Sequence, residues 1–175
     1  DEQLMQRAAR GSDRAFEELY NRYARRLQGF FVRRLGNDAD LAADFMHDTF
    51  LRLYAAREKY HEGSNFRAWL YTIAYNLCKN HHRNQLTMIS DEGKDLADET
   101  NIEVKLDAAM LHEALRDVLR SLPEPYAMLF SLHYEEELTI PQTAQITDLP
   151  EGTVKSRLHK AMNIIKQNLK QYENR

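Results

Sequence analysis

Residues 138–165 have the sequence LTIPQTAQITDLPEGTVKSRLHKAMNII, a pattern that indicates a helix-turn-helix. Ala144 is small at the point where two helices would cross closely, and the apolar Val154 follows ten residues later. Between them lies the segment 146–149, which suits a tight turn because its Asp148 tolerates the left-handed backbone conformation better than most residues. The stretch therefore predicts two crossed helices, the second of which lies in the DNA major groove with its N-terminal residues at the base edges.

The second helix, expected over 150–171, separates into an apolar and a polar face. Pro150 suits its first turn, and Glu151 suits its positive N-terminal end. Val154 and Leu158 lie one turn apart and are expected to face the first helix. The polar positions avoid that stripe and offer donors to bases and phosphates: Thr153, Lys155, Ser156, Arg157, His159 and Lys160. An ordinary helical hairpin with a solvated basic face has the same pattern, so the motif alone leaves both interpretations open.

Charge is distributed unevenly along the chain of 175 residues, which is 43% hydrophobic and 29% charged and has a net charge of −3. Residues 1–85 carry +3, residues 86–104 carry −5 and residues 151–175 carry +4. Two basic regions separated by an acidic tract favour local contacts with nucleic acid. Because no apolar run reaches membrane-spanning length and the N-terminus is charged, we expect neither membrane insertion nor a secretory signal. A single cysteine, Cys78, excludes an intrachain disulfide and is typical of a cytoplasmic protein.

The sequence before the acidic tract predicts one helical bundle, the domain 1–85. Gly and Pro are few, at 6 and 4, as expected of an all-α protein. Apolar residues recur at helical spacing over 16–30, 42–53 and 66–77, which predicts three or four helices around an aromatic-rich core. Candidate N-caps of the first two stripes are Ser12 or Asp13, and Asp38.

The acidic tract 86–104 has no aromatic residue and no sustained apolar period, so we predict a flexible linker. Its nineteen residues would span up to roughly 60 Å if extended, so the flanking domains need not touch. After it come an apolar stripe that ends at Leu122, a short helix around 127–133 and the helix-turn-helix. These elements predict a compact second domain of about four helices over 105–175.

Four segments resemble, in order along the chain, the parts of one protein family. PEGTVKSRLHKAM (150–162) is similar to the recognition helix of bacterial extracytoplasmic-function (ECF) sigma factors. DADLAADFMHDTFLRLY (38–54) resembles the family's helix that binds the polymerase clamp, and FRAWLYTIAYNLCKNHHR (66–83) its helix that recognises and melts the −10 promoter element. LPEPYAMLFSLHYEEELTIPQTAQ (122–145) resembles the start of its −35-binding domain. Agreement across both domains is more specific than a lone helix-turn-helix.

The resemblance implies a promoter-specificity subunit of bacterial RNA polymerase. The second domain would bind the −35 element as duplex through the polar positions of its last helix. The first domain would contact the −10 element through a loop and a helix face: Ser64, Asn65, Phe66, Asn76, Lys79, Asn80 and Arg83. Its contacts with the polymerase clamp would come from Asp44, His47, Asp48, Leu51, Arg52 and Tyr54. Trp69 falls on an apolar stripe and is expected in the core, and the spacing of Phe66 also allows a core position.

Two groups of residues also allow a metal interpretation. Asp44, His47 and Asp48 share a helix face, and a carboxylate with a histidine three residues on builds di-metal sites in bundles. That use needs a second such motif, which the sequence lacks. Cys78 and His82 lie four residues apart, but structural zinc needs four ligands. We therefore expect no metal and no cofactor.

The sequence contains no nucleotide-binding Gly-rich loop, nucleophile elbow or zinc-protease motif, so we expect a protein that is not an enzyme. The expected partners are core RNA polymerase, promoter DNA and an anti-sigma factor, and the expected location is the bacterial cytoplasm, at the nucleoid when in holoenzyme. Two alternatives remain open. A stand-alone helix-turn-helix regulator would bind duplex DNA without polymerase, and a metal-dependent bundle protein or enzyme would contain metal when purified.

Overall fold

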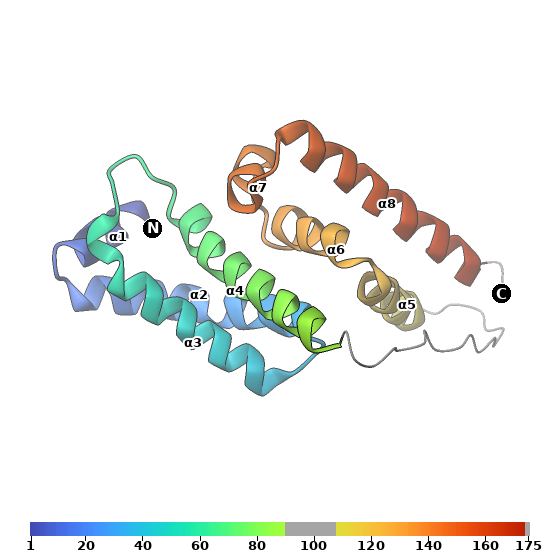
Figure 1. Cartoon of the computed structure of the whole chain (residues 1–175), viewed down its shortest axis with the longest axis horizontal. Helices are drawn as coiled ribbons and strands as arrows, with labels where there is room; N and C mark the ends of the chain where they lie inside the picture. The colour runs from blue at the N-terminus through green and yellow to red at the C-terminus, as the bar shows by residue number, and fades with distance from the viewer. Residues whose placement is uncertain (90–107, 174–175) are drawn as a thin grey trace.

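The computed structural model describes residues 1–89 and 108–173, and these residues form helices and turns without a β-strand. The all-α prediction is thus confirmed for the part of the chain that is described. Most of the predicted linker, 90–104, lies outside it, whereas residues 86–89 continue the preceding helix. The helices group into two sets that lie side by side in Figure 1.

The first set consists of four helices and one short turn of 3-10 helix: α1 (Glu2–Ala9), α2 (Asp13–Arg34), α3 (Ala39–Ala55), η1 (Arg57–Lys59) and α4 (Phe66–Ile89). Ser12 caps α2, accepting a hydrogen bond from the backbone N–H of Ala15, and Asp38 caps α3 through the N–H of Leu41. Both residues are among the N-caps that the sequence predicted. The prediction of three or four helices allowed a further helix but did not locate it: α1 forms because Leu4, Met5 and Ala8 lie on one face and are buried against α2.

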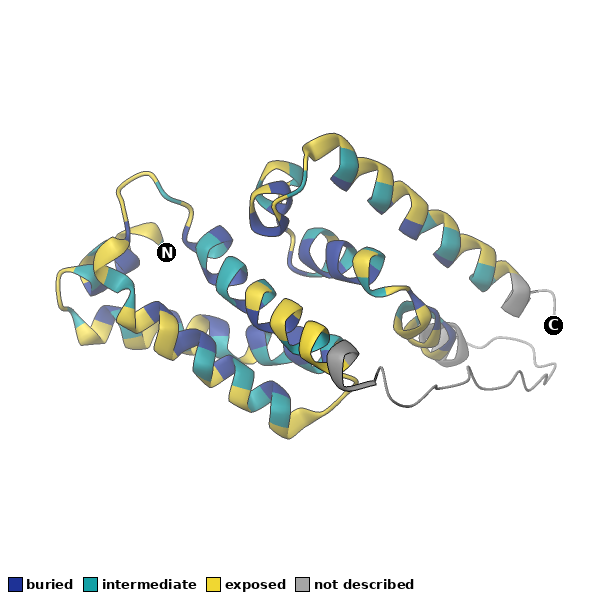
Figure 2. Ribbon diagram, viewed as in Figure 1, coloured by how far each residue is buried: buried dark blue, intermediate teal, exposed yellow. Residues whose placement is uncertain are grey.

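The second set contains α5 (Ala108–Ser121), α6 (Glu124–Phe130), a π-helical turn η2 (Ser131–Glu135), α7 (Ile140–Thr147) and α8 (Glu151–Glu173). The long helix α8 packs along α5 and α6 and crosses α7 at its N-terminal end. Figure 2 shows that the side of α8 facing α6 is buried or intermediate, while its outer side is exposed. This arrangement is the expected bundle that ends in a helix-turn-helix.

One hydrophobic cluster spans both sets, although the linker length did not require them to touch. Met128, Leu132, Leu138 and Ile146 of the second set are buried in the same cluster as residues of α1 to α4. The most extensive contact between helices across the boundary is that of α4 with α7. Burial of apolar side chains stabilises this contact, because about 25 cal/mol is gained per Å² removed from water. The described residues therefore form one closed molecule.

Candidate nucleic-acid interface

The helix-turn-helix has the geometry that the sequence predicted. Val154 is fully buried and Leu158 nearly so, and both pack in one cluster with Ala144 of α7 and Leu129 of α6. Asp148 ends α7 in the left-handed conformation, with φ 55° and ψ 43°. α7 begins with a capping box, in which the Thr139 side chain accepts from the Gln142 N–H and the Gln142 side chain accepts from the Thr139 N–H.

The outer side of the first turns of α8 is basic and accessible. Lys155, Ser156, His159 and Lys160 are exposed, whereas Thr153 and Arg157 are half-buried. Lys155 lies 3.8 Å from the Glu151 carboxylate, and the Lys160 ammonium lies 5.6 Å from the centre of the Tyr126 ring. Because both lysines remain accessible to solvent, the helix presents two cations beside hydroxyl and imidazole groups.

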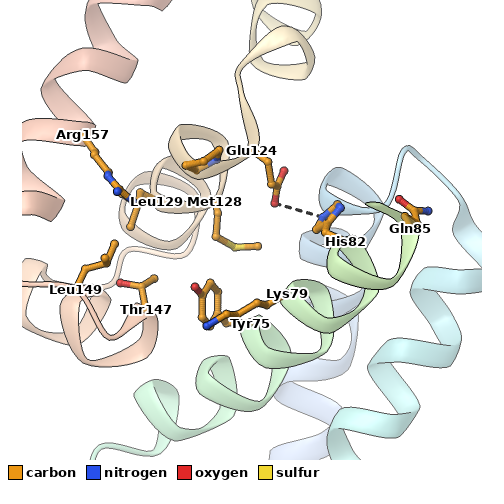
Figure 3. A pocket seen from close by; sticks show the side chains of 11 residues that line it. Tyr75, Lys79, His82, Gln85, Glu124, Met128, Leu129, Thr147, Leu149 and Arg157 are labelled. Carbon is orange, nitrogen blue, oxygen red and sulfur yellow. Dashed lines mark ion pairs between the residues drawn. The ribbon is translucent and has the colours of Figure 1, made fainter. Parts of the chain in front are cut away.

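Arg157 is the exception on this helix, because it points toward the first set of helices. It lines a cavity of about 520 Å³ together with Tyr75 and Lys79 of α4 and Met128 of α6 (Figure 3). Arg157 also acts on the Tyr75 hydroxyl, whose pKa is raised by burial and partly lowered again by the guanidinium. In this closed form, two residues expected to contact different promoter elements thus line one cavity.

The loop before α4 forms a second, more polar cavity of about 460 Å³. The Tyr60 hydroxyl donates a 2.6 Å hydrogen bond to the Ser64 carbonyl, and the Asn65 side chain accepts one of 2.8 Å from the Ala68 N–H. Asn65 therefore caps α4 as well as facing the cavity. The Tyr60 and Trp69 rings stack with centroids 5.4 Å apart. Burial raises the pKa of Tyr60 to about 12, so its hydroxyl stays protonated as a donor.

Phe66 does not belong to this loop surface, and its predicted contact with DNA is corrected by the structure. Its side chain is fully buried, and its ring lies 5.2 Å from that of Tyr23. Phe66 is buried because it is the first residue of α4 and lies on the apolar face of this helix, which points toward the core. Of the two alternatives that the spacing allowed, the core position is the one adopted.

The face of α4 expected to contact the −10 element carries Asn76, Lys79, Asn80 and Arg83, all of which are exposed. Their spacing of three or four residues places them along one side of the helix. The Lys79 ammonium lies 5.8 Å from the centre of the Tyr75 ring. The predicted residues are thus brought together, on a face that continues from the loop cavity.

The predicted polymerase-binding residues lie along the outer side of α3. Asp44, His47, Leu51, Arg52 and Tyr54 are exposed and Asp48 is half-buried. Leu51, 69% exposed, is an apolar side chain in contact with water among polar neighbours. Arg52 forms an ion pair of 3.0 Å with Asp48, one turn earlier on the same face.

The residues considered for metal binding do not form a ligand cluster. Cys78 is fully buried, and burial raises the pKa of its thiol to about 12, so it is protonated at neutral pH. The His82 imidazole instead lies 3.4 Å from the Glu124 carboxylate of α6. Among the described residues, no group of three or more His, Cys, Asp or Glu side chains is placed to hold a metal ion.

The sequence did not single out several residues that the structure places at these surfaces. Tyr60 completes the loop cavity with Trp69, and Gln145 of α7 reaches the same cavity from the second set of helices. An aromatic residue just before the Gly63-Ser64-Asn65 loop was the available signal for Tyr60. Nothing local signals Gln145, because its position depends on how the two sets pack.

The fold and the basic face of α8 together define a helical DNA-binding protein with two candidate contact surfaces. Residues 19–86 match the family model of sigma-70 region 2, and residues 112–164 match that of sigma-70 region 4. The ECF RNA polymerase sigma-E factor of Escherichia coli K12 is 30% identical over 94% of this chain and 92% of its own length. The RNA polymerase sigma-H factor of Pseudomonas aeruginosa is 29% identical over 94% of this chain and 91% of its length.

Solved structures share the fold. CnrH, in a complex with the cytosolic domain of CnrY, superimposes with a TM-score of 0.72 at 21% identity, covering 98% of this chain and 97% of that one. The sigma factor RpoE from Bartonella quintana, in a complex with the anti-sigma factor NepR, gives a TM-score of 0.70 at 23% identity over 89% and 96% of the two chains.

The chain belongs to the ECF sigma factors of the sigma-70 family, and it is a sigma subunit through which RNA polymerase recognises promoters. This assignment explains why a helix-turn-helix is combined with a second helical unit in one chain. Within the described part of the chain, no helix is long and apolar enough to cross a membrane.

Proposed function

We propose that the two helical sets divide promoter recognition between them. Helices α5 to α8 bind the −35 element as duplex, while α1 to α4 bind core polymerase and capture one strand of the −10 element. The observation that carries this proposal is the exposed row Lys155, Ser156, His159 and Lys160 on the outer side of a helix whose inner side is buried. The acidic linker 86–104 passes through a basic channel of the polymerase, where its charge of −5 mimics nucleic acid.

Readout of the −35 element requires both positioning and specificity. Lysines 155 and 160 contact phosphates, which gives affinity but little sequence information. Arg157 makes bidentate bonds to a guanine, for which discrimination is typically about 1–3 kcal/mol. For this contact Arg157 must leave the cavity that it lines with Tyr75 and Lys79.

Strand capture at the −10 element uses the loop cavity and the outer face of α4. A flipped base enters the cavity lined by Tyr60, Ser64 and Asn65, where the stacked Tyr60–Trp69 pair offers an aromatic wall. Asn76, Lys79, Asn80 and Arg83 follow the single strand beyond it. Binding of the flipped base and the single-stranded backbone offsets the unpairing and unstacking energy without ATP.

Core polymerase binds the outer side of α3. Leu51 supplies an apolar contact that is desolvated on binding, and its polar neighbours form a rim: Asp44, His47, Asp48, Arg52 and Tyr54. An anti-sigma factor is a further partner, since the sigma factor RpoE of Bartonella quintana, which shares this fold, was solved in a complex with the anti-sigma factor NepR. These partners place the protein in the bacterial cytoplasm, at the nucleoid when in holoenzyme, acting as a non-catalytic subunit.

The proposal is tested by run-off transcription on genomic fragments with core polymerase, with and without this protein. We expect specific transcripts only when the protein is present. Lys155→Ala should reduce them at limiting holoenzyme, because a phosphate contact is lost. Lys166→Ala is the matched control, an exposed lysine on the same helix about three turns farther on. Equal loss in both variants, or specific nanomolar binding of duplex by the free protein, would contradict the proposal.

The role of the loop is tested separately, because Asn65 also caps α4. Asn65→Ser keeps a good N-cap but removes the amide from the cavity. We expect it to reduce initiation on duplex promoters more than on templates already opened at the −10 element. An equal loss on both templates would show that the loop does not act in strand opening.

A further inference from the structure

A carboxylate of the second helical set is buried among cations of the first. Glu136 lies between η2 and α7 and is 1% exposed. Its Oε2 accepts a 2.7 Å hydrogen bond from Arg26 Nε, and its Oε1 accepts one of 2.7 Å from Arg33 Nη2. The fully buried Tyr71 of α4 donates its hydroxyl to the same carboxylate. All three of these partners belong to α2 or α4.

The residues on either side of Glu136 extend the contact. Glu135 pairs with Arg33 at 2.9 Å, and the exposed Glu137 lies 3.4 Å from Arg26. Arg67 at the start of α4 donates to the backbone carbonyl of Glu136. Three consecutive glutamates therefore meet three arginines across the boundary between the two sets.

The local backbone holds these side chains in place. The Glu136 N–H donates to the Ser131 carbonyl, which closes the π-helical turn, and Glu137 adopts the left-handed conformation with φ 54°. Residues other than glycine adopt this conformation rarely. It lets the chain turn directly into Leu138, which is buried in the shared core.

We propose that Glu136, with Arg26, Arg33 and Tyr71, is an intramolecular latch that holds the free sigma factor closed without any partner protein. A buried carboxylate is costly unless it is paired and hydrogen-bonded. Its paired form exists only when the two helical sets are docked, because its partners lie on the opposite set. Removing either side of the pair therefore favours the open form.

The closed form brings one edge of each proposed DNA-contacting surface together, while Lys155, Ser156, His159 and Lys160 stay exposed. Gln145 of α7 lines the cavity of Ser64 and Asn65, and Arg157 shares a cavity with Lys79. The −35 and −10 elements lie roughly 25 base pairs apart, about 85 Å of duplex at 3.4 Å per pair. One closed molecule cannot bind both, so polymerase must open the latch. This consequence, unlike the latch itself, rests on the proposed function.

The latch is tested by the distance between the two sets in the full chain, measured by fluorescence transfer between dyes on Glu17→Cys and Lys166→Cys. The two labelled positions are exposed, and the native Cys78 is buried. We expect Glu136→Gln to lower the ratio of closed to open molecules by about tenfold or more, as for loss of hydrogen bonds to a charged group. Glu113→Gln, with the same charge change at an exposed position of α5, should leave the ratio unchanged.

A second variant covers the case in which Glu136→Gln disturbs its own domain. Arg26→Gln combined with Arg33→Gln leaves the sequence of α5 to α8 unaltered but removes both arginine partners of the Glu136 carboxylate. This double variant should therefore be more open than the wild type. Circular dichroism checks that helices are retained. A wild-type protein that is already open, or a distance unchanged in both the Glu136 and the double-arginine variants, would overturn the proposal.

The effect of the latch on DNA binding is measured separately. Free Glu136→Gln protein should bind a −35 duplex more tightly than the wild type, by up to the factor through which the closed form is depleted. With saturating core polymerase, both proteins should transcribe equally, because the polymerase has already opened them. If neither protein directs transcription, the proposed function fails while the distance measurement still decides whether the latch exists.

Discussion

In the proposed function, individual side chains of α8 make separate contributions to promoter recognition. Arg157 and Lys160 lie one turn apart, yet one is half-buried toward α4 and the other is exposed beside the Tyr126 ring. A planar guanidinium can read a guanine, whereas an ammonium acts as a point charge on phosphate. Substitutions at these two positions should therefore differ in kind and not only in size.

Arg157→Ala should relax the −35 preference at one or two base pairs, with a loss of about 1–3 kcal/mol of discrimination. Lys160→Ala should weaken binding similarly on all sequences and reduce the salt dependence by about one phosphate contact. The measurement is transcription from a randomised −35 library with each variant in holoenzyme. An unchanged base preference in the Arg157 variant would place this helix outside the groove.

Val154→Asp should destabilise α5 to α8, because Val154 is fully buried and its replacement places an unpaired charge in the cluster with Ala144 and Leu158. We expect a loss of more than about 3 kcal/mol, measured by urea unfolding followed by circular dichroism. Gln167→Asp is the control, since it adds the same charge at an exposed position of α8. Similar losses in the two variants would mean that charge alone, and not burial, is responsible.

At the scale of elements, the turn between α7 and α8 sets the direction in which α8, the proposed recognition helix, leaves α7. Asp148 closes α7 in the left-handed conformation, and the Leu149 N–H donates to the Ala144 carbonyl. This conformation costs most non-glycine residues roughly 1–2 kcal/mol, and Asp less than most, because its short side chain can hydrogen-bond locally. The turn therefore contains strain that a substitution can relieve.

Asp148→Gly should raise the free energy of unfolding by up to about 1 kcal/mol, and Asp148→Ala should lower it by a similar amount. Thermal unfolding of both variants provides the measurement. The Asp148 side chain is exposed, so the opposite signs reflect how easily each residue adopts the left-handed conformation: glycine more easily than Asp, and alanine less easily. A stabilised alanine variant would contradict the left-handed assignment.

For the whole molecule, the contact between α4 and α6 includes a titratable pair. His82 lies 3.4 Å from the Glu124 carboxylate, and Arg34 of α2 lies 3.5 Å from the same group. The pKa of His82 is raised, mainly because Glu124 stabilises the imidazolium, while burial and the Arg34 charge oppose the shift. His81, whose ring centroid lies 5.9 Å from that of His82, is the other titratable neighbour.

The stability of the closed molecule should therefore fall as the pH rises through the folded pKa of His82. Because that pKa lies above the ordinary value of about 6.5, the stabilisation is complete below pH 6.5 and is lost above the raised value. Urea unfolding at a series of pH values measures it. His82→Gln should flatten this part of the profile, whereas His61→Gln, at an exposed position, should not. An unaltered profile in the His82 variant would assign the dependence to another group.

Much of the candidate site follows from local sequence, because its causes are local. Helical periodicity predicted the buried Val154 and Leu158, and side-chain chemistry predicted the caps Ser12 and Asp38 and the left-handed Asp148. Each depends on residues within one or two turns. Phe66 shows where prediction from local sequence fails. Its spacing allowed either the loop surface or the core, and only packing against Tyr23 decided between them.

The sequence by itself determined an all-α chain, the helix-turn-helix and membership of the ECF sigma factors. Only the tertiary structure decided that the two helical sets share a hydrophobic cluster, that Glu136 is buried among Arg26, Arg33 and Tyr71, and that Arg157 lines a cavity with Lys79. The physical reason is the range of the interactions. Periodicity and capping act within a few residues, whereas the partners of Glu136 lie from 65 to 110 residues away along the chain. No local pattern encodes a contact of that separation, so it became visible only once the helices were packed.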